Sequence, residues 1–433
     1  MSNGPIDIER ALEQAHARAS HPKKLPALAA VERNFRALGD DRYLMEVEDL
    51  AITFEVDRLR RERGELTGEL TVGCRLPGAR TVNGNGTMSI ADLNFSSAQA
   101  RTTRAKHLAK LCSIPILDME VLVEEFCQRV LQADRDGQPG VYLHTLSKPD
   151  RENDNVEIHG LILPKRHPSI IFGDGGSVKS YLGLYIAGTL AKEGIPTALF
   201  DWELAGEDHR DRLERLFGNL MPRILYVRCE RPLVHEMERL RRMVREKGIA
   251  YGIFDSVAYA CGGAPESAEI AGAYFRAVRQ IGGGSLHIAH VNKSETSDQK
   301  PFGSIFWSNS ARSTWYAQRA EETPDGSIIR LGLFNRKSNL GPLRPPLGYT
   351  VTFTEDQTVF RRSEIAENPD LAGKLSVRQR MTSLLRKGAM PPDAIAEEID
   401  ADVETVKRTV RRYKNQFTVI DGGRIGLLEK SAS

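Results

Sequence analysis

The stretch GDGGSVKS, residues 173–180, decides the fold of this chain. A short apolar run at residues 169–172 precedes it, and a helical pattern at residues 180–193 follows it. Glycines in a turn between a strand and a helix let backbone N–H groups approach a bound anion, which the helix N-terminus also favours. The stretch therefore predicts a phosphate-binding loop within an α/β domain.

The chain beyond this loop alternates apolar strands with amphipathic helices. Strands are predicted at residues 197–201, 223–227, 250–255 and 285–290, and helices at residues 208–217, 234–247 and 267–281. Two further strand-like runs, at residues 313–319 and 327–335, extend the same sheet. Alternation of this kind predicts a parallel sheet with helices on both faces.

The flanking regions follow other patterns. Apolar residues alternate with a period of two at residues 50–56 and 66–72, with a solvated connection expected at residues 60–63, and helical patterns follow at residues 98–111 and 118–133. Residues 1–40 have weak helical spacing. We expect a mixed α/β domain at residues 1–150 and the sheet domain at residues 151–366.

The last region, residues 367–433, has the pattern of a winged helix. Three helical stretches at residues 377–386, 392–399 and 403–415 precede a segment, residues 417–429, in which Gly422 and Gly423 separate two short strands. Helix, helix, helix and hairpin is the order of that motif.

Composition narrows the class of protein. The chain has 433 residues, of which 40% are hydrophobic and 27% charged, with a net charge of +2. These values are typical of globular proteins, and no apolar run is long enough to span a membrane. We expect a cytoplasmic protein whose five cysteines are buried thiols. Any contact with nucleic acid must come from local basic patches.

The loop itself supplies the candidate nucleotide ligands. Lys179 offers a positive charge to the β and γ phosphates of ATP, and Ser180 can bind Mg²⁺. Val178 stands where the phosphate-loop pattern has glycine, and its branched side chain can crowd the loop. The alternatives are a glycine-rich turn that binds nothing and a loop that binds without hydrolysing. The predicted nucleotide-binding residues are Gly173, Asp174, Gly175, Gly176, Ser177, Val178, Lys179, Ser180 and Asp255.

Two carboxylates at strand ends complete the predicted site. Asp255 ends an apolar strand and is the expected partner of Ser180 at Mg²⁺. Glu203 follows the strand after the loop helix and is the expected general base for water. Asp201 and Glu207 are its competitors, and Glu203 could instead cap the next helix or pair with a nearby arginine.

Taken together, the motifs resemble those of the RecA-like ATPases of plasmid RepA-type helicases, a group near the replicative hexameric helicases. The resemblance covers roughly residues 155–350 and rests on the loop, DWE at 201–203, DS at 255–256, HVNK at 290–293, PFGS at 301–304 and residues 335–341. It implies a ring, with a hexamer as the expected size.

The resemblance also assigns roles to residues outside the loop. It implies that Glu203 activates water and that His290 senses the γ-phosphate. Arg336 with Lys337 would reach the nucleotide of the neighbouring subunit, and Arg312 is the rival for that role. Without the resemblance, His290 is more simply a core histidine.

Two other segments are candidates for contact with DNA. The polar run at residues 290–300 contains Lys293 and Lys300 and reads either as a DNA-facing loop or as a solvated one. The third helix of the C-terminal region has a basic face, and its valines Val403, Val406 and Val410 form the inward face. The predicted DNA-binding residues are Lys407, Arg408, Arg411, Arg412 and Arg424.

Three functions fit these motifs. The first is an ATP-dependent DNA translocase or helicase in replication or mobile-element maintenance, acting on single- or double-stranded DNA. The second is a nucleotide-gated DNA-binding regulator or loader with slow or no hydrolysis. The third is an assembly ATPase that holds a protein partner through residues 1–150. Trp307 and Trp315 are expected in the core or at an interface rather than as stacking platforms for bases.

Overall fold

The computed structural model describes most of the chain. The described residues are 33–39, 41–82, 84–112, 118–137, 140–148, 154–291, 304–320, 323, 325–339, 341–365, 368, 371, 373 and 375–428. The chain divides into two compact units, Met1–Ser147 and Lys148–Ser433. None of the described helices is long and apolar enough to cross a membrane.

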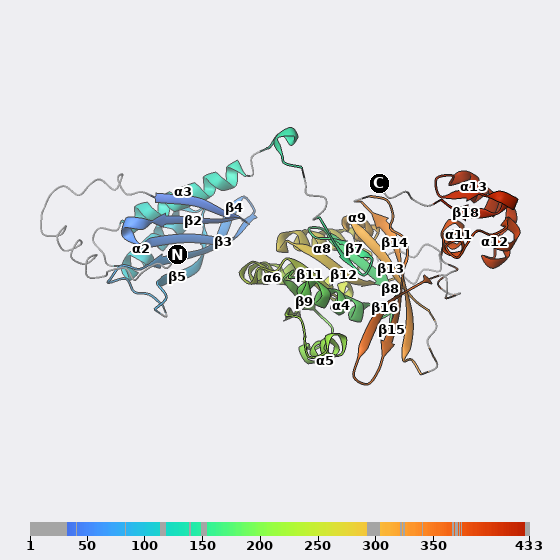
Figure 1. Cartoon of the computed structure of the whole chain (residues 1–433). Coiled ribbons are helices and arrows are strands. Elements are labelled where there is room, and N and C mark those ends of the chain that lie inside the picture. Colours follow the sequence, from blue (N-terminus) through green and yellow to red (C-terminus); the bar gives the residue numbers. More distant parts are fainter. Residues whose placement is uncertain are drawn as a thin grey trace, which may run out of the picture. The chain divides into compact units, whose positions relative to one another are not determined.

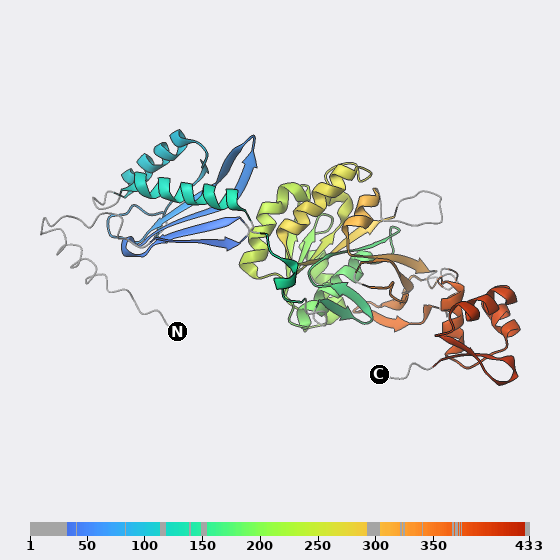
Figure 2. The ribbon, with the colours of Figure 1, turned by 90° about the horizontal axis from the view of Figure 1, so that it is seen from above.

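The first unit is an antiparallel sheet with helices on one face (Figures 1 and 2). Its five strands lie in chain order: β1 (Arg33–Gly39), β2 (Arg42–Val47), β3 (Ile52–Glu62), β4 (Glu65–Cys74) and β5 (Thr87–Asn94). The helices α2 (Ala98–Leu111) and α3 (Met119–Asp136) close a core around Phe54 and Phe126. The alternation of apolar residues predicted β3 and β4, because every second residue over much of each strand is buried.

Two expectations for this unit were wrong. Residues 33–39 form β1 rather than part of a helical lead-in; the rest of that segment, residues 1–32, lies outside the described residues. Residues 60–62 are not a loop, because β3 continues to Glu62 and pairs with β4. Arg60 forms an ion pair with Asp92 on β5, and Arg61 forms one with Asp134 on α3. These partners are distant in the sequence, so the residues around 60–62 do not show that the arginine charges are balanced.

The second unit contains a sheet of nine strands in the order β10-β9-β11-β12-β8-β13-β14-β15-β16. The first six run parallel: β8 (Pro168–Gly173), β9 (Thr197–Asp201), β10 (Ile224–Arg228), β11 (Tyr251–Asp255), β12 (Gly284–His290) and β13 (Ser313–Ala320). Because these strands are parallel, their carboxyl ends meet at one edge, where ligands of such sheets bind.

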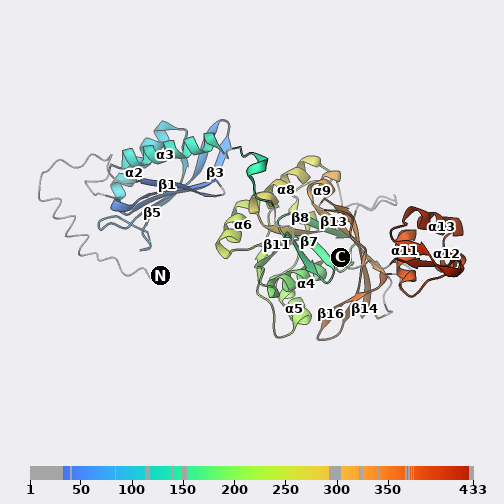
Figure 3. The same cartoon turned by 45° about the horizontal axis from the view of Figure 1, so that its top comes forward.

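Helices cover both faces of this sheet (Figure 3). The helices α6 (Leu233–Lys247) and α8 (Ala268–Ile281) pack on the face that carries Ile170 and Phe172. The opposite face carries Ile171 and packs against α4 (Lys179–Lys192), with α5 (Gly206–Phe217) beside α4. A short α7 (Val257–Ala260) follows β11.

The antiparallel extension of the sheet is longer than expected. Beyond β14 (Ile328–Ser338) the sheet adds β15 (Leu347–Phe353) and β16 (Thr358–Ser363), which the sequence pattern did not predict. Two short strands, β6 (Asn155–Ile158) and β7 (Leu161–Pro164), form a separate hairpin that was not predicted either. Runs this short carry a weak period, so their pairing becomes visible only in three dimensions.

The end of the chain folds around its own hydrophobic cluster. The helices α11 (Val377–Leu385), α12 (Pro392–Glu398) and α13 (Val403–Arg412) precede a hairpin of β17 (Phe417–Val419) and β18 (Ile425–Leu427). Met381, Ile395 and Val406 are buried in this cluster, to which Val403 and Val410 also contribute. The predicted inward face of the third helix is thus confirmed.

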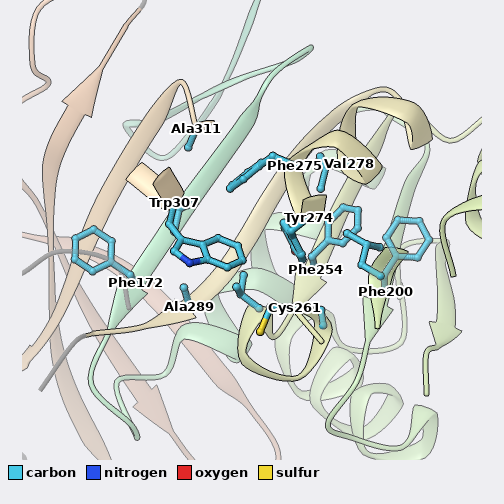
Figure 4. Packing of buried hydrophobic residues seen from close by; sticks show 14 of the residues in the cluster. Phe172, Phe200, Phe254, Cys261, Tyr274, Phe275, Val278, Ala289, Trp307 and Ala311 are labelled. Atoms are coloured by element: carbon cyan, nitrogen blue, oxygen red, sulfur yellow. The ribbon is translucent and has the colours of Figure 1, made fainter. Parts of the chain in front are cut away.

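The predicted fold class is confirmed in its architecture: the chain has a mostly parallel α/β sheet with helices on both faces, preceded by a β-rich domain. Trp307, in α9 (Ile305–Ser310), and Trp315 are 1% and 0% exposed, as expected of core residues. Figure 4 shows Trp307 beside Tyr274 and Phe275, with ring centroids 5.1 and 5.6 Å away. All five cysteines are buried and free.

Candidate nucleotide site

The loop between β8 and α4 is shaped by two of its glycines. A Cβ at Gly173 would lie 2.2 Å from the carbonyl oxygen of Ala317 on β13, so no other residue fits there. Gly176 has a φ of +73°, in the left-handed region that glycine adopts without strain. The loop therefore turns tightly against the sheet and leads into the N-terminus of α4, where backbone N–H groups can bind an anion.

Val178 also adopts a left-handed conformation. Its φ is 59° and its ψ is 18°, and it occupies the N-cap position of α4. A β-branched residue is disfavoured there because its Cβ crowds the backbone, at a cost of about 1–2 kcal/mol. The position where the phosphate-loop pattern has glycine is thus one where the backbone itself favours glycine.

A substitution series at this position tests the strain. We expect Val178→Gly to be more stable than Val178→Ala by about 1 kcal/mol, because both remove the side chain but only glycine relieves the left-handed cost. Chemical denaturation of the two variants measures the difference. Equal stability, or a more stable alanine variant, would mean that the loop is unstrained. Hydrolysis by Val178→Gly should match or exceed that of the wild type.

Lys179 is the first residue of α4 and is only 5% exposed. Its Nζ donates to the carbonyl oxygens of Gly173 and Asp174 at 2.9 and 2.6 Å, and to Ser177 Oγ at 3.0 Å. Burial lowers the pKa of Lys179 to about 8, although the carboxylates of Asp255, Asp174 and Glu203 oppose the shift. A phosphate would supply the lysine with stronger, charged acceptors in place of these three neutral ones.

The side chains of Ser180 and Asp255 are in contact with each other. Asp255, at the end of β11, is 2% exposed and accepts a hydrogen bond from the Ser180 hydroxyl. Its Oδ1 is buried without a hydrogen-bond partner among the described residues. An orphaned carboxylate oxygen next to a hydroxyl fits Mg²⁺, which usually takes one or two carboxylates and completes its shell with phosphate and water oxygens. The described residues contain no cluster of three or more His, Cys, Asp or Glu side chains that would hold a metal ion alone.

Keeping Asp255 ionised in the folded protein lowers the free energy of unfolding. Burial, and then the nearby charges of Glu203 and Asp201, raise its pKa from 3.8 to about 6. A raised carboxyl pKa means that the folded state binds the proton more tightly than the unfolded chain does. The stabilising contribution of this group is therefore complete below pH 3.8 and is lost as the pH rises through about 6.

We expect Asp255→Asn to stabilise the protein at pH 8 by about 1–3 kcal/mol, because a pKa unit corresponds to about 1.4 kcal/mol. The difference between variant and wild type should shrink towards pH 4, where the wild-type carboxyl is protonated. Urea denaturation of both proteins at the two pH values measures it. A variant that is less stable at pH 8 would contradict the predicted cost. The same variant should lose Mg²⁺-dependent hydrolysis.

Glu203 lies two residues beyond β9, at the same edge of the sheet. Its side chain is exposed and accepts a hydrogen bond from the hydroxyl of Ser256. Its charge is felt by Lys179, Asp255 and His290, whose pKa values it raises. Glu203 thus has both a free approach from solvent and a position among the other site residues, as a general base requires.

The competitors for this role are differently placed. The carboxylate of Asp201 is fully buried and accepts from the backbone N–H groups of Glu203 and Leu204 at 3.3 and 2.7 Å. Its oxygens therefore hold the turn after β9. Glu207 lies in the first turn of α5 and is exposed.

His290 ends β12 directly beside the loop. It pairs in register with Gly173, the last residue of β8. Burial lowers the pKa of His290, and the positive charge of Lys179 lowers it further. A neutral imidazole at the end of the strand next to the loop is suited to contact a phosphate without adding charge.

Arg319 is a residue of this site that the sequence pattern did not reveal. It lies near the end of β13, and its Nη1 donates to the carbonyl oxygen of Gly176 at 3.0 Å. The sequence does place a basic residue near the end of the β13 strand. That signal pointed to the loop only once β13 was known to pair with β8, and this pairing was not predictable from the local sequence. Arg319 brings a second cation to the loop from within the same chain.

The two residues expected to act on a neighbouring subunit lie elsewhere on the sheet. In the antiparallel register, Lys337 pairs with Thr314, which pairs in turn with Ile170 near the start of β8. Lys337 Nζ donates to the carbonyl oxygens of Ser308, Asn309 and Ala311 and so uses its three protons at the C-terminus of α9. The exposed Arg336 instead lies over the rings of Tyr316 and Phe334.

The predicted DNA-binding residues form a separate surface. Lys407, Arg408, Arg411 and Arg412 are exposed on α13, and Arg424 is exposed before β18. Arg411 contacts Glu404 at 3.4 Å, and both side chains are largely exposed, so the pair leaves the cation accessible. Lys293 and Lys300 lie outside the described residues.

Comparisons with known proteins add little to this geometry. No protein-family model and no curated protein matches the chain. Among solved structures, the chain is similar to one described as an ATPase domain, with a TM-score of 0.36 and 12% sequence identity. That alignment covers 46% of this chain and 85% of the other.

Proposed function

We propose that this chain is a helicase-type ATPase that binds ATP with Mg²⁺ and hydrolyses it. One observation carries the proposal: Lys179, Ser180 with Asp255, Glu203 and His290 converge at the carboxyl edge of the parallel sheet. They come from four separate elements, and each has the chemistry that one step of phosphoryl transfer needs.

The residues divide the work of hydrolysis among them. Lys179 and the N–H groups of the loop bind the phosphates, and Arg319 supports the loop at Gly176. Ser180 and Asp255 would hold Mg²⁺, which supplies positive charge to the phosphate oxygens. Glu203 accepts a proton from water as the water oxygen bonds to the γ-phosphorus. The bond from the γ-phosphorus to the bridging oxygen breaks, and ADP and phosphate leave.

We further propose that the chain acts on DNA through α13. Its exposed basic side chains lie on one helix, while Val406 anchors the opposite face in the cluster of the winged-helix-like region. A helix presented in this way can enter a major groove and place its basic residues on phosphates. Contacts between these basic side chains and DNA phosphates would not depend on the DNA sequence.

A charge reversal on α13 tests this contact. We expect the double variant Arg408→Glu with Arg411→Glu to bind DNA at least about tenfold more weakly. The slope of log affinity against log salt concentration should become shallower by about two. Fluorescence anisotropy across a salt series measures both quantities. Arg386→Glu with Lys387→Glu, two exposed cations outside α13, is the matched control. Unchanged affinity in the α13 variant would favour a protein-assembly role.

Assembly into a ring is the third part of the proposal. Arg336 is exposed, and its neighbour Lys337 is engaged within its own chain. Arg336 is therefore our candidate for the residue that reaches the nucleotide of a neighbouring subunit. The proposed assembly is a hexamer, which mass measurement with and without nucleotide would detect.

A second function is favoured by one observation, the left-handed Val178. If the backbone strain at Val178 slows ATP hydrolysis, the chain is a nucleotide-gated DNA-binding regulator or loader that turns over ATP slowly. ATPase assays without DNA, with single-stranded DNA and with double-stranded DNA separate the two. Hydrolysis stimulated by DNA supports the helicase-type ATPase. Tight ATP binding with negligible turnover, and a DNA affinity that depends on nucleotide, supports the regulator.

A further inference from the structure

The backbone around Glu203 is fixed on several sides. The carboxylate of Asp201 accepts from the N–H groups of Glu203 and Leu204. The N–H of the preceding Trp202 donates to the carbonyl oxygen of Asp255 at 2.8 Å, and its indole Nε1 donates to that of Arg231 at 2.8 Å. The main chain at Glu203 therefore has little freedom, and only its side chain can choose a direction.

Packing does not fix the direction of the Glu203 side chain. The Glu203 side chain is exposed, and a glutamate has three rotatable bonds. Its carboxylate oxygen Oε1 accepts a hydrogen bond from Ser256 Oγ. Ser256 follows Asp255 directly and is only 1% exposed, so its hydroxyl is held firmly at the end of β11.

Charges near Glu203 act on its carboxylate in opposite directions. Asp255 carries a like charge close enough for Glu203 to raise its pKa, so the two carboxylates repel each other. The positive charge of Lys179, whose pKa Glu203 also raises, attracts the glutamate. A hydrogen bond from a buried neutral hydroxyl fixes the direction of the carboxylate without adding a further charge.

We propose that Ser256 is a positioning residue, whose hydroxyl holds the Glu203 carboxylate at the carboxyl edge of the sheet, facing Lys179, Asp255 and His290. The inference rests on the proposed ATPase function. Ser256 acts through Glu203 and does not itself touch the reacting atoms. Without that hydroxyl, the exposed glutamate loses the hydrogen bond that holds it toward the site, and hydrolysis slows while nucleotide binding persists.

The test compares Ser256→Ala with Ser169→Ala. Ser169 is a buried serine on β8 whose hydroxyl has no hydrogen-bond partner among the described residues, so it controls for removal of a buried hydroxyl. We expect Ser256→Ala to lower kcat by about 10- to 100-fold, the factor for losing a hydrogen bond to a charged group. The KM for ATP and the affinity for a fluorescent ADP analogue should change less than about twofold. Thermal unfolding checks that both variants fold.

A double-mutant cycle separates positioning from a structural effect. In the Glu203→Gln background, residual hydrolysis is measured in single-turnover reactions with radiolabelled ATP. We expect Ser256→Ala to change it less than about twofold, because the carboxylate that Ser256 positions is already gone. Equal losses in both backgrounds would overturn the inference, as would full kcat in Ser256→Ala when the wild type hydrolyses ATP. A wild-type chain without ATPase activity would overturn the proposed function, and this inference with it.

Discussion

Lys179→Ala should abolish detectable ATP hydrolysis. The ammonium group is a buried cation at the start of α4, and its three neutral acceptors leave it ready to exchange them for phosphate oxygens. Loss of a single preorganised charge at a transferring phosphoryl group costs about 10²- to 10³-fold in rate, or more when the group also binds the ground state. Release of labelled phosphate measures the rate.

The fold should survive this change. Burial lowers the pKa of Lys179 from 10.5 to about 8, so the stabilising contribution of the lysine is complete only above pH 10.5 and is lost as the pH falls through about 8. At neutral pH the buried charge is therefore a cost, and its removal should not lower the unfolding temperature. A variant that loses activity because it unfolds would contradict this account.

Lys192→Ala provides the matched control. Lys192 lies at the other end of α4, is exposed and has its Nζ 4.7 Å from the ring centroid of Phe217. Both substitutions remove one positive charge from the same helix, but only Lys179 faces the loop. Full hydrolysis by Lys179→Ala, or equal losses in the two variants, would argue against a phosphate-binding role for the loop.

Glu203→Gln should lower kcat by about 10²- to 10⁴-fold and leave nucleotide binding intact. The glutamine can still accept the Ser256 hydrogen bond through its amide oxygen but cannot take a proton from water. General bases contribute rate factors of this size. Steady-state ATPase assays give kcat, and titration with a fluorescent nucleotide gives the affinity.

Glu207→Gln is the control for this prediction. Glu207 is an exposed glutamate in the first turn of α5, so the change in charge and size is identical. We expect it to keep at least about half of the wild-type kcat, because it lies outside the convergent set of site residues. If Glu207→Gln loses activity and Glu203→Gln does not, the general base has been assigned to the wrong glutamate.

Much of the second unit could be predicted because its signals are local. The strand at Thr197–Asp201 was predicted with its bounds, and α4, α6 and α8 to within one residue at each end. Residues buried on both faces of a sheet form continuous apolar runs, and helices on its faces carry a period of 3.6. The strands β15 and β16 escaped because their partners lie across an antiparallel extension that no short window reveals.

The sequence by itself determined the α/β class, the loop at residues 173–180 and the carboxylates at strand ends, because glycine spacing and hydrophobic period act over a few residues. Only the tertiary structure decided which groups meet. The order of the strands brings Glu203, Asp255 and His290 to one edge of the sheet. It also places Arg319 at the loop and Lys337 at the end of α9, where its Nζ donates to backbone carbonyl oxygens. It also decided that Val178 is left-handed and that Ser256 bonds to Glu203, since backbone strain and side-chain direction depend on packing between distant segments.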